Sequence, residues 1–182
     1  MKRHHGSIVR LAEAWGHDAQ GAEQVARCAW PTILQRLSGF DGAGSLAAWL
    51  LRVVSELASA TAPRRPVDQD DDDAGAVVDG STFDPEGRWA SSGRPRNPAG
   101  TAGDVPPDAL RKALAALPAC QRVVITLRDV EALGPDDVAA VLGVTVAAQH
   151  ALLHRARTAL VGEIWSGQGP TRETRCTERE GA

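Results

Sequence analysis

The middle of the chain constrains the fold most strongly. Residues 67–105 show no helical or strand period, and they hold an aspartate run, Asp68 and Asp70–Asp73, followed by many Gly, Pro and Ser residues. A segment this polar buries too little apolar surface to fold, and its 39 residues are too many for a structureless loop inside one compact domain. We therefore predict two folded domains, residues 7–66 and 106–166, joined by an acidic disordered linker and followed by a disordered tail, 167–182.

The net charge of −3 is concentrated in that linker. Residues 1–66 carry +3, residues 67–105 carry −6 and residues 106–182 are neutral. This balance excludes a strongly basic, histone-like binder of nucleic acid, but it leaves room for local basic faces on either domain.

Composition predicts an all-α fold for both domains. Ala, Leu and Arg dominate, aromatics are 4%, and Val, Ile and Thr never alternate with polar residues for long. No apolar run reaches the roughly 18 residues of a membrane span, and no signal-type core follows the first residues, so we expect a cytoplasmic protein without membrane insertion. The three cysteines are odd in number and far apart, which favours reduced thiols over disulfides or a metal site: Cys28, Cys120 and Cys176.

The first domain is predicted to hold three helices, over residues 7–16, 22–37 and 46–62. Pro31 lies inside the second and should kink it, at a cost of about 3 kcal/mol. A glycine-rich loop, 39–45, precedes the third helix, and Ser45 is a suitable N-cap for it. The tryptophans on the apolar faces are expected in the core: Trp15, Trp30 and Trp49.

The second domain is predicted to hold four helices, over residues 107–117, 120–133, 135–142 and 146–165. Gly143 permits the positive φ with which the last two helices cross steeply, and Thr145 caps the longer one. The inward positions are Val123, Val124, Leu127, Val130, Val138, Ala139, Leu142, Val144, Val146, Leu153 and Ala156. This spacing is typical of a helix-turn-helix whose second helix, the recognition helix, enters a major groove, and equally of an ordinary helical hairpin.

Several motifs together resemble the extracytoplasmic-function (group 4) sigma factors of RNA polymerase. In the second domain these are Leu117-Pro118, Gln121-Arg122, 127–131, Val138-Ala139, 142–144 and 152–157, which are similar to region 4 of that family. In the first domain they are Ala22-Glu23, 40–42, 44–46, 48–50 and Leu57-Ala58, which are similar to region 2. The resemblance covers roughly residues 8–166, with both regions in the family's order.

The resemblance implies roles for the two domains. Region 2 would bind the β′ clamp of core RNA polymerase through Glu23, Gln24, Arg27 and Cys28. Its loop and third helix would read the −10 promoter element as melted single strand through Phe40, Asp41, Gly42, Ser45, Trp49, Arg52 and Glu56. Region 4 would grip the β flap and read the −35 element through Thr145, Ala148, Gln149, His150, His154, Arg155 and Arg157. The further partners are promoter DNA and an anti-sigma factor, and no cofactor or metal is implied.

The chain departs from the family pattern in both regions. Arg27 and Cys28 stand where acidic or polar clamp contacts are usual, and Pro31 interrupts the same helix. Glu56 follows Ser55 where the family often has Arg-Asn, and a carboxylate facing nucleic acid repels phosphate. The recognition helix is rich in alanine, and the first helix is expected to begin later than in most members.

We therefore predict a sigma factor rather than an enzyme, because no nucleophile–base pair, metal set or phosphate-binding loop is visible. Two alternatives remain open. The departures favour a sigma-like protein that binds polymerase or an anti-sigma factor but has lost promoter opening. A stand-alone helix-turn-helix regulator is the other. Phe83 and Trp89 in the linker either dock on a domain or partner, or are simply exposed.

Overall fold

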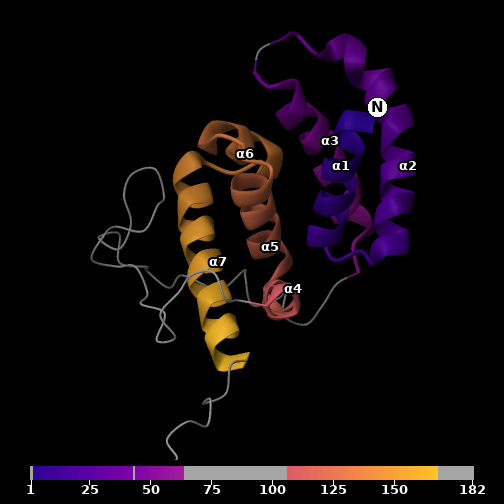
Figure 1. The fold of residues 1–182 in the computed structure, drawn as a ribbon. Coiled ribbons are helices and arrows are strands. Elements are labelled where there is room, and N and C mark those ends of the chain that lie inside the picture. The colour runs from indigo at the N-terminus through magenta and orange to yellow at the C-terminus, as the bar shows by residue number, and fades with distance from the viewer. Residues whose placement is uncertain (1, 43, 64–105, 168–182) are drawn as a thin grey trace, which may run out of the picture.

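The computed structural model describes residues 2–42, 44–63 and 106–167, and every regular element in these ranges is helical (Figure 1). The elements are α1 (Lys2–Ala14), α2 (Ala19–Arg36), the 3-10 turn η1 (Leu37–Gly39), α3 (Leu46–Thr61), α4 (Pro107–Ala116), α5 (Ala119–Ile125), the π-helical turn η5 (Thr126–Val130), α6 (Pro135–Leu142) and α7 (Val146–Gly167). The predicted all-α fold is confirmed. The predicted linker, with Phe83 and Trp89, lies outside the described residues. No single described helix is long and apolar enough to cross a membrane, and the one pair that qualifies together, α6 with α7, is bent by 94°.

Helices α1, α2 and α3 form a small bundle around a shared apolar core. Ile8, Leu11 and Val54 are completely buried at its centre. Trp15 packs against this core, and its indole Nε1 donates a hydrogen bond to the Ser55 hydroxyl at 3.2 Å. Trp30 and Trp49 also pack against it, as predicted, although all three rings keep some exposure.

Two predicted helix starts in this bundle are wrong. Helix α1 begins at Lys2 rather than near residue 7. Helix α2 begins at Ala19, because the Asp18 side chain accepts from the Gly21 amide, and it continues through Pro31 without a break. The core contacts of Ala29 and Ile33 on either side hold the helix together there, while Pro31 itself is exposed.

Helices α4 to α7 form the second bundle, in which the predicted helix-turn-helix is present. Helix α6 has the predicted bounds, and it ends at Gly143 in the left-handed region, with φ of 69°. Thr145 then starts α7, since its Oγ1 accepts from the Ala148 amide at 3.1 Å. The single helix predicted over 120–133 is instead α5 followed by η5.

That change of helix type corrects the predicted inward face. Val130 is 56% exposed, because the wider π-helical turn shifts the residues that follow Thr126 out of the α-helical register. Val144 is 41% exposed, since the turn at Gly143 carries it to the surface. Val138, Leu153 and Ala156 are completely buried, as predicted.

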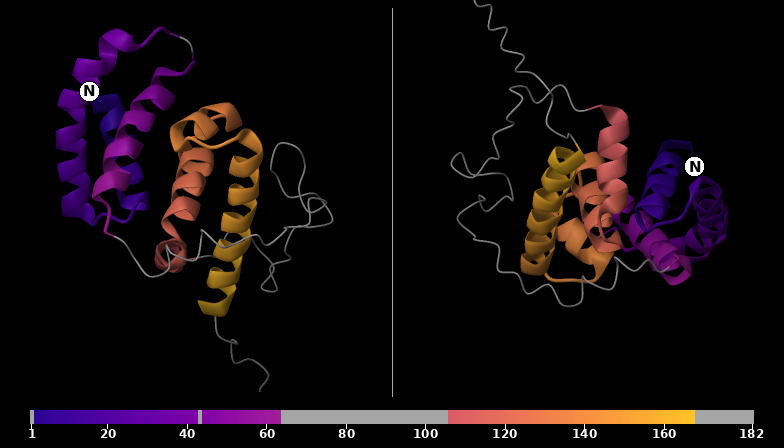
Figure 2. Two further views of the ribbon diagram at one scale, coloured as in Figure 1. Left: turned by 180° about the vertical axis from the view of Figure 1, so that it is seen from behind. Right: turned by 90° about the horizontal axis from the view of Figure 1, so that it is seen from below.

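The two bundles pack directly on each other. Helix α3 lies along α6, and α1 contacts α5 and η5; both views of Figure 2 show the first bundle against one side of the second. Arg10 of α1 forms an ion pair with Glu131, with Nη2 to Oε1 at 2.7 Å. The buried Arg122 donates from Nε to the Ala14 carbonyl at 2.8 Å and from Nη1 to the Leu117 carbonyl. One guanidinium therefore binds the carboxyl ends of α1 and α4, which belong to different bundles.

Candidate nucleic-acid interface

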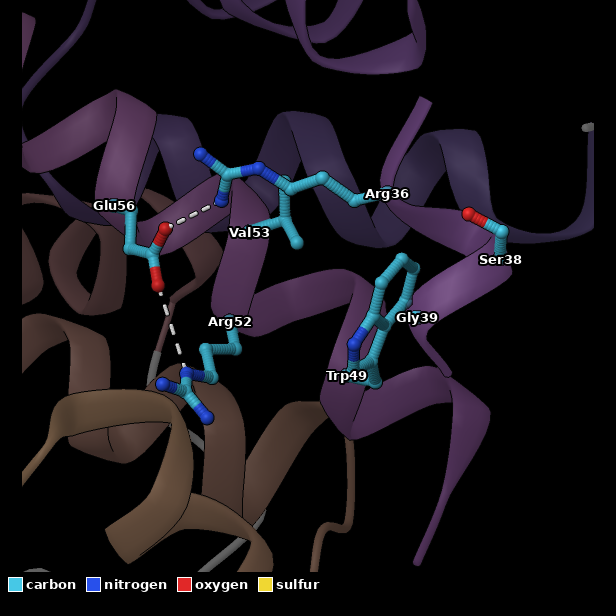
Figure 3. A pocket seen from close by; sticks show the side chains of 7 residues that line it. All are labelled: Arg36, Ser38, Gly39, Trp49, Arg52, Val53 and Glu56. Atoms are coloured by element: carbon cyan, nitrogen blue, oxygen red, sulfur yellow. Dashed lines mark hydrogen bonds and ion pairs between the residues drawn. The ribbon is translucent and has the colours of Figure 1, made fainter. Parts of the chain in front are cut away.

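A pocket of about 430 Å³ opens between the end of α2 and the outer face of α3. We call it the Trp49 pocket; its lining is Arg36, Ser38, Gly39, Trp49, Arg52, Val53 and Glu56. Figure 3 shows the indole of Trp49 on one side and the carboxylate of Glu56, between two arginines, on the other. The site thus combines a flat aromatic surface with two cations.

The two arginines of the Trp49 pocket are held by one carboxylate. Arg36 Nη1 lies 2.8 Å from Glu56 Oε2, and Arg52 Nε lies 3.5 Å from Glu56 Oε1. All three side chains are about half exposed, with 54%, 60% and 48% of the side chain accessible for Arg36, Arg52 and Glu56. The cluster carries a net charge of +1, so it is compatible with a phosphate chain despite Glu56.

The structure brings three of the residues predicted for the −10 element together in this pocket: Trp49, Arg52 and Glu56. Phe40 stands beside them, with its ring centroid 5.6 Å from that of Trp49 and the planes tilted by 54°. Asp41, Gly42 and Ser45 are exposed in the loop but do not line the pocket. Ser45 is the predicted N-cap of α3, because its side chain accepts from the Ala48 amide.

Sequence reasoning missed Arg36, Ser38 and Gly39. Arg36 reaches Glu56 across 20 positions, a contact that only the packing of α2 on α3 creates. The pairing of Arg52 with Glu56 could have been found from the sequence, since residues four apart on a helix face each other.

The residues of the recognition helix α7 that were predicted to contact DNA differ in how exposed they are. Thr145 and Ala148 are exposed, and His150, His154 and Arg155 are partly buried. Gln149 has no exposed surface at all, so the predicted contact of Gln149 with a base edge is wrong in this arrangement. The cause is helical geometry: Gln149 shares the inward face of α7 with Leu153 and Ala156, four and seven residues further on.

Arg157 forms an ion pair with Asp129, which lies in the π-helical turn η5. Its Nη2 lies 2.5 Å from Asp129 Oδ1 and its Nε 3.1 Å from Asp129 Oδ2, a bidentate pair, and only 19% of the arginine side chain is exposed. Arg155, two residues earlier on α7, is partly buried as well. Among the described residues no cluster of three or more His, Cys, Asp or Glu side chains could hold a metal ion.

The predicted clamp residues lie on α2. Gln24, Arg27 and Cys28 are exposed and joined by hydrogen bonds, since Arg27 donates to Gln24 Oε1 at 2.7 Å and Gln24 donates to Cys28 Sγ at 3.6 Å. Pro31 and Leu34 extend this exposed stripe, and Leu34 is 57% accessible. Glu23 is partly buried and pairs with His5 of α1 at 3.2 Å.

The chain is similar to known proteins in fold and, over part of its length, to a known family in sequence. Residues 108–160 match the family "Sigma-70, region 4". The fold is similar to the sigma factor RpoE in its complex with the anti-sigma factor NepR from Bartonella quintana, with a TM-score of 0.57, 19% identity, and coverage of 91% of this chain and 93% of that one. It is also similar to CnrH in its complex with the cytosolic domain of CnrY, with a TM-score of 0.58, 19% identity, and coverage of 92% of this chain and 86% of that one. No curated protein sequence matches the chain.

The matched region contains α6, the turn at Gly143 and most of α7, so the alternative of an ordinary helical hairpin is set aside. The structural likeness extends over both bundles, and with it the resemblance noted in the sequence is confirmed. Residues 108–160 thus match the sigma-70 region 4 family, and the two bundles together have a fold like that of the sigma factor RpoE and of CnrH.

Proposed function

We propose that this protein binds core RNA polymerase and directs promoter-specific transcription initiation, with α1–α3 reading the −10 element and α6–α7 the −35 element. The observation that carries the proposal is the presence, in one chain, of a sigma-70 region 4 helix-turn-helix and the Trp49 pocket on a second bundle. No catalytic role is assigned to the chain itself. Its place of action is the cytoplasm, where the polymerase meets DNA.

The chemistry of the Trp49 pocket suits a melted DNA strand. An indole face binds an unpaired base by stacking, whatever its identity, and arginines beside it bind the phosphates on either side. Arg36 and Arg52 both line the pocket, and they lie on either side of Glu56. A duplex does not expose base faces, so this site supports reading of single-stranded DNA.

The N-terminal half of α7 suits a duplex groove through its shape more than through its charge. Thr145 and Ala148 leave its first turn free of bulky groups, so that the helix approaches base edges closely and offers methyl contacts. His154 and Arg155 supply polar contacts one to two turns later. Because this surface has few donors, we expect weak binding by the isolated domain and tight binding only when both domains are tethered to polymerase.

Two exposed surfaces support docking on polymerase. The α2 stripe of Gln24, Arg27, Cys28, Pro31 and Leu34 offers a polar end and an apolar end to the β′ clamp. On the second bundle the described residues with large exposed apolar side chains are Leu110, Val130 and Val144, at 39%, 56% and 41%, and they are candidates for the β flap contact. An anti-sigma factor is a further proposed partner, because both similar structures are complexes, one with an anti-sigma factor and one with a cytosolic domain.

The test adds the purified chain to core polymerase that lacks any sigma factor and scores transcription from a promoter library. Sequence-selective transcripts are the expected result. Binding to core without transcripts would contradict promoter opening. Binding to duplex DNA without any affinity for core would point to a stand-alone regulator.

A second candidate function is a sigma-like interaction protein that binds polymerase or an anti-sigma factor without opening promoters. The Arg157–Asp129 pair and the burial of Gln149 favour it, because they withdraw two of the polar groups predicted to reach DNA. Binding without transcription in the same experiment would support it.

A further inference from the structure

Among the described residues that line the Trp49 pocket, Glu56 is the only acidic one. It is fixed from two sides, with Oε2 at 2.8 Å from Arg36 and Oε1 at 3.5 Å from Arg52. Each carboxylate oxygen can accept more than one hydrogen bond, so both keep acceptor capacity for a molecule inside the pocket. Glu56 is thus an oriented acceptor with no donor of its own.

The bases of DNA differ in what they offer to such a group. Cytosine, adenine and guanine carry an exocyclic amino group, which donates, whereas thymine carries two carbonyl oxygens with its single ring donor, N3–H, between them. A carboxylate accepts readily from an exocyclic amino group, whereas the carbonyl oxygens on both sides of the thymine N3–H repel it. A base stacked on Trp49 would meet this acceptor at its edge, because indole and carboxylate line the same pocket.

We propose that Glu56 is a specificity-determining residue that selects, in the Trp49 pocket, an unpaired base with an exocyclic amino group and rejects thymine. Arg36 and Arg52 are positioning residues, which hold the carboxylate toward the pocket. This inference rests on the proposed function, since it assumes that α1–α3 bind a melted promoter strand. It also gives Glu56 a role other than the repulsion of phosphate that its sequence position suggests.

The test uses the full chain bound to core polymerase and a set of promoter probes with a pre-melted −10 strand. Each position of that strand carries deoxycytidine or deoxyuridine in turn, a pair that exchanges the amino group for a carbonyl and N3 for N3–H without adding the thymine methyl. At one position we expect the wild-type complex to bind the cytosine probe about tenfold more tightly, as measured by fluorescence anisotropy.

Glu56→Gln should abolish that preference, because an amide both donates and accepts and therefore tolerates either base. Preferences at the other positions should stay within about twofold. Glu13→Gln is the matched control, because Glu13 is an exposed acid of α1 that does not line the Trp49 pocket, and it should keep the wild-type preference.

Equal binding of both probes at every position would overturn the assignment, and so would an undiminished preference in Glu56→Gln. A complex that binds none of the pre-melted probes would overturn the proposed function and this inference with it. The two failures are distinguishable, because the first leaves binding to the probes intact.

Discussion

The surroundings of Gln149 do not match the polarity of its side chain. Its side chain is fully buried, and neither Oε1 nor Nε2 has a hydrogen-bond partner among the described residues. A buried polar group without a partner costs about 1–3 kcal/mol. The amide thus lowers the stability of the helix-turn-helix rather than contributing a contact to DNA.

Replacing the amide should therefore stabilise the protein. Gln149→Leu keeps roughly the same volume and removes the unpaired polar atoms, so the free energy of unfolding should rise by about 1–2 kcal/mol in urea denaturation. Gln35→Leu, on the exposed side of α2, is the control and should change it by less than about 0.5 kcal/mol. A loss of stability in Gln149→Leu would mean that the amide is hydrogen-bonded after all.

Single residues were predictable where the chemistry is local. The caps at Ser45 and Thr145 follow from the preference of hydroxyl side chains for free backbone amides, and both are present. The ion pairs of Arg36 and Arg157 were not predictable, because each joins residues at least 20 positions apart. Such pairs decide which cations of the candidate site remain available to DNA.

At the scale of elements, the turn between α6 and α7 depends on one backbone conformation. Gly143 has φ of 69°, and no atom lies within 4 Å of the place where a Cβ would stand. The need for glycine is therefore conformational and not a matter of space. Because the crossing of α6 and α7 was inferred from this glycine, the bounds of α6 and the first residue of α7 were predicted correctly.

Gly143→Ala should lower the free energy of unfolding by about 1 kcal/mol, since alanine is strained in the left-handed region. Gly143→Asn should cost less, because asparagine tolerates that region. Gly162→Ala serves as the control: this glycine lies inside α7 with open space around its Cβ, so alanine should stabilise the helix by about 0.5–1 kcal/mol. Equal effects at Gly143 and Gly162, measured by urea denaturation, would contradict this reading.

In two stretches of the chain the helices depart from what the local sequence favours. Helix α2 passes through Pro31, and the predicted helix over 120–133 changes to a π-helical turn at Thr126. The local sequence favours a different structure at both places. A proline inside a helix favours a kink or a break, and the residues around Thr126 keep an apolar spacing compatible with an α-helix. At Pro31 the buried neighbours hold the helix together. For the π-helical turn at Thr126 the described contacts give no single cause.

At the scale of the whole molecule, the contact between the two bundles sets a condition on promoter binding. Helices α3 and α6 are in direct contact. The −10 and −35 elements are about 25 base pairs apart, which corresponds to a distance on the order of 80 Å along B-form DNA. The two bundles must therefore separate before both elements are read. The sequence predicted two domains but not their contact, because Arg10 and Glu131 are 121 positions apart.

This separation is measurable with a pair of fluorescent labels. In a cysteine-free background, one label at Gln35 on α2 and one at Thr158 on α7 use exposed positions of the two bundles. Energy transfer should be high in the free protein and should fall sharply when core polymerase and promoter DNA are added. Transfer that stays high in an actively transcribing complex would contradict the requirement for separation.

The central claim is that one chain reads two separate promoter elements with two different bundles. Sequencing the transcribed members of a randomised promoter library, with core polymerase and this protein as the sole sigma factor, tests it most directly. We predict two short enriched blocks with a spacer between them. Replacing His154 and Arg155 by alanine should weaken only the upstream block, and Glu56→Gln should alter only the downstream one. Enrichment of a single block, or none, or the same change in both blocks from either variant, would contradict the account.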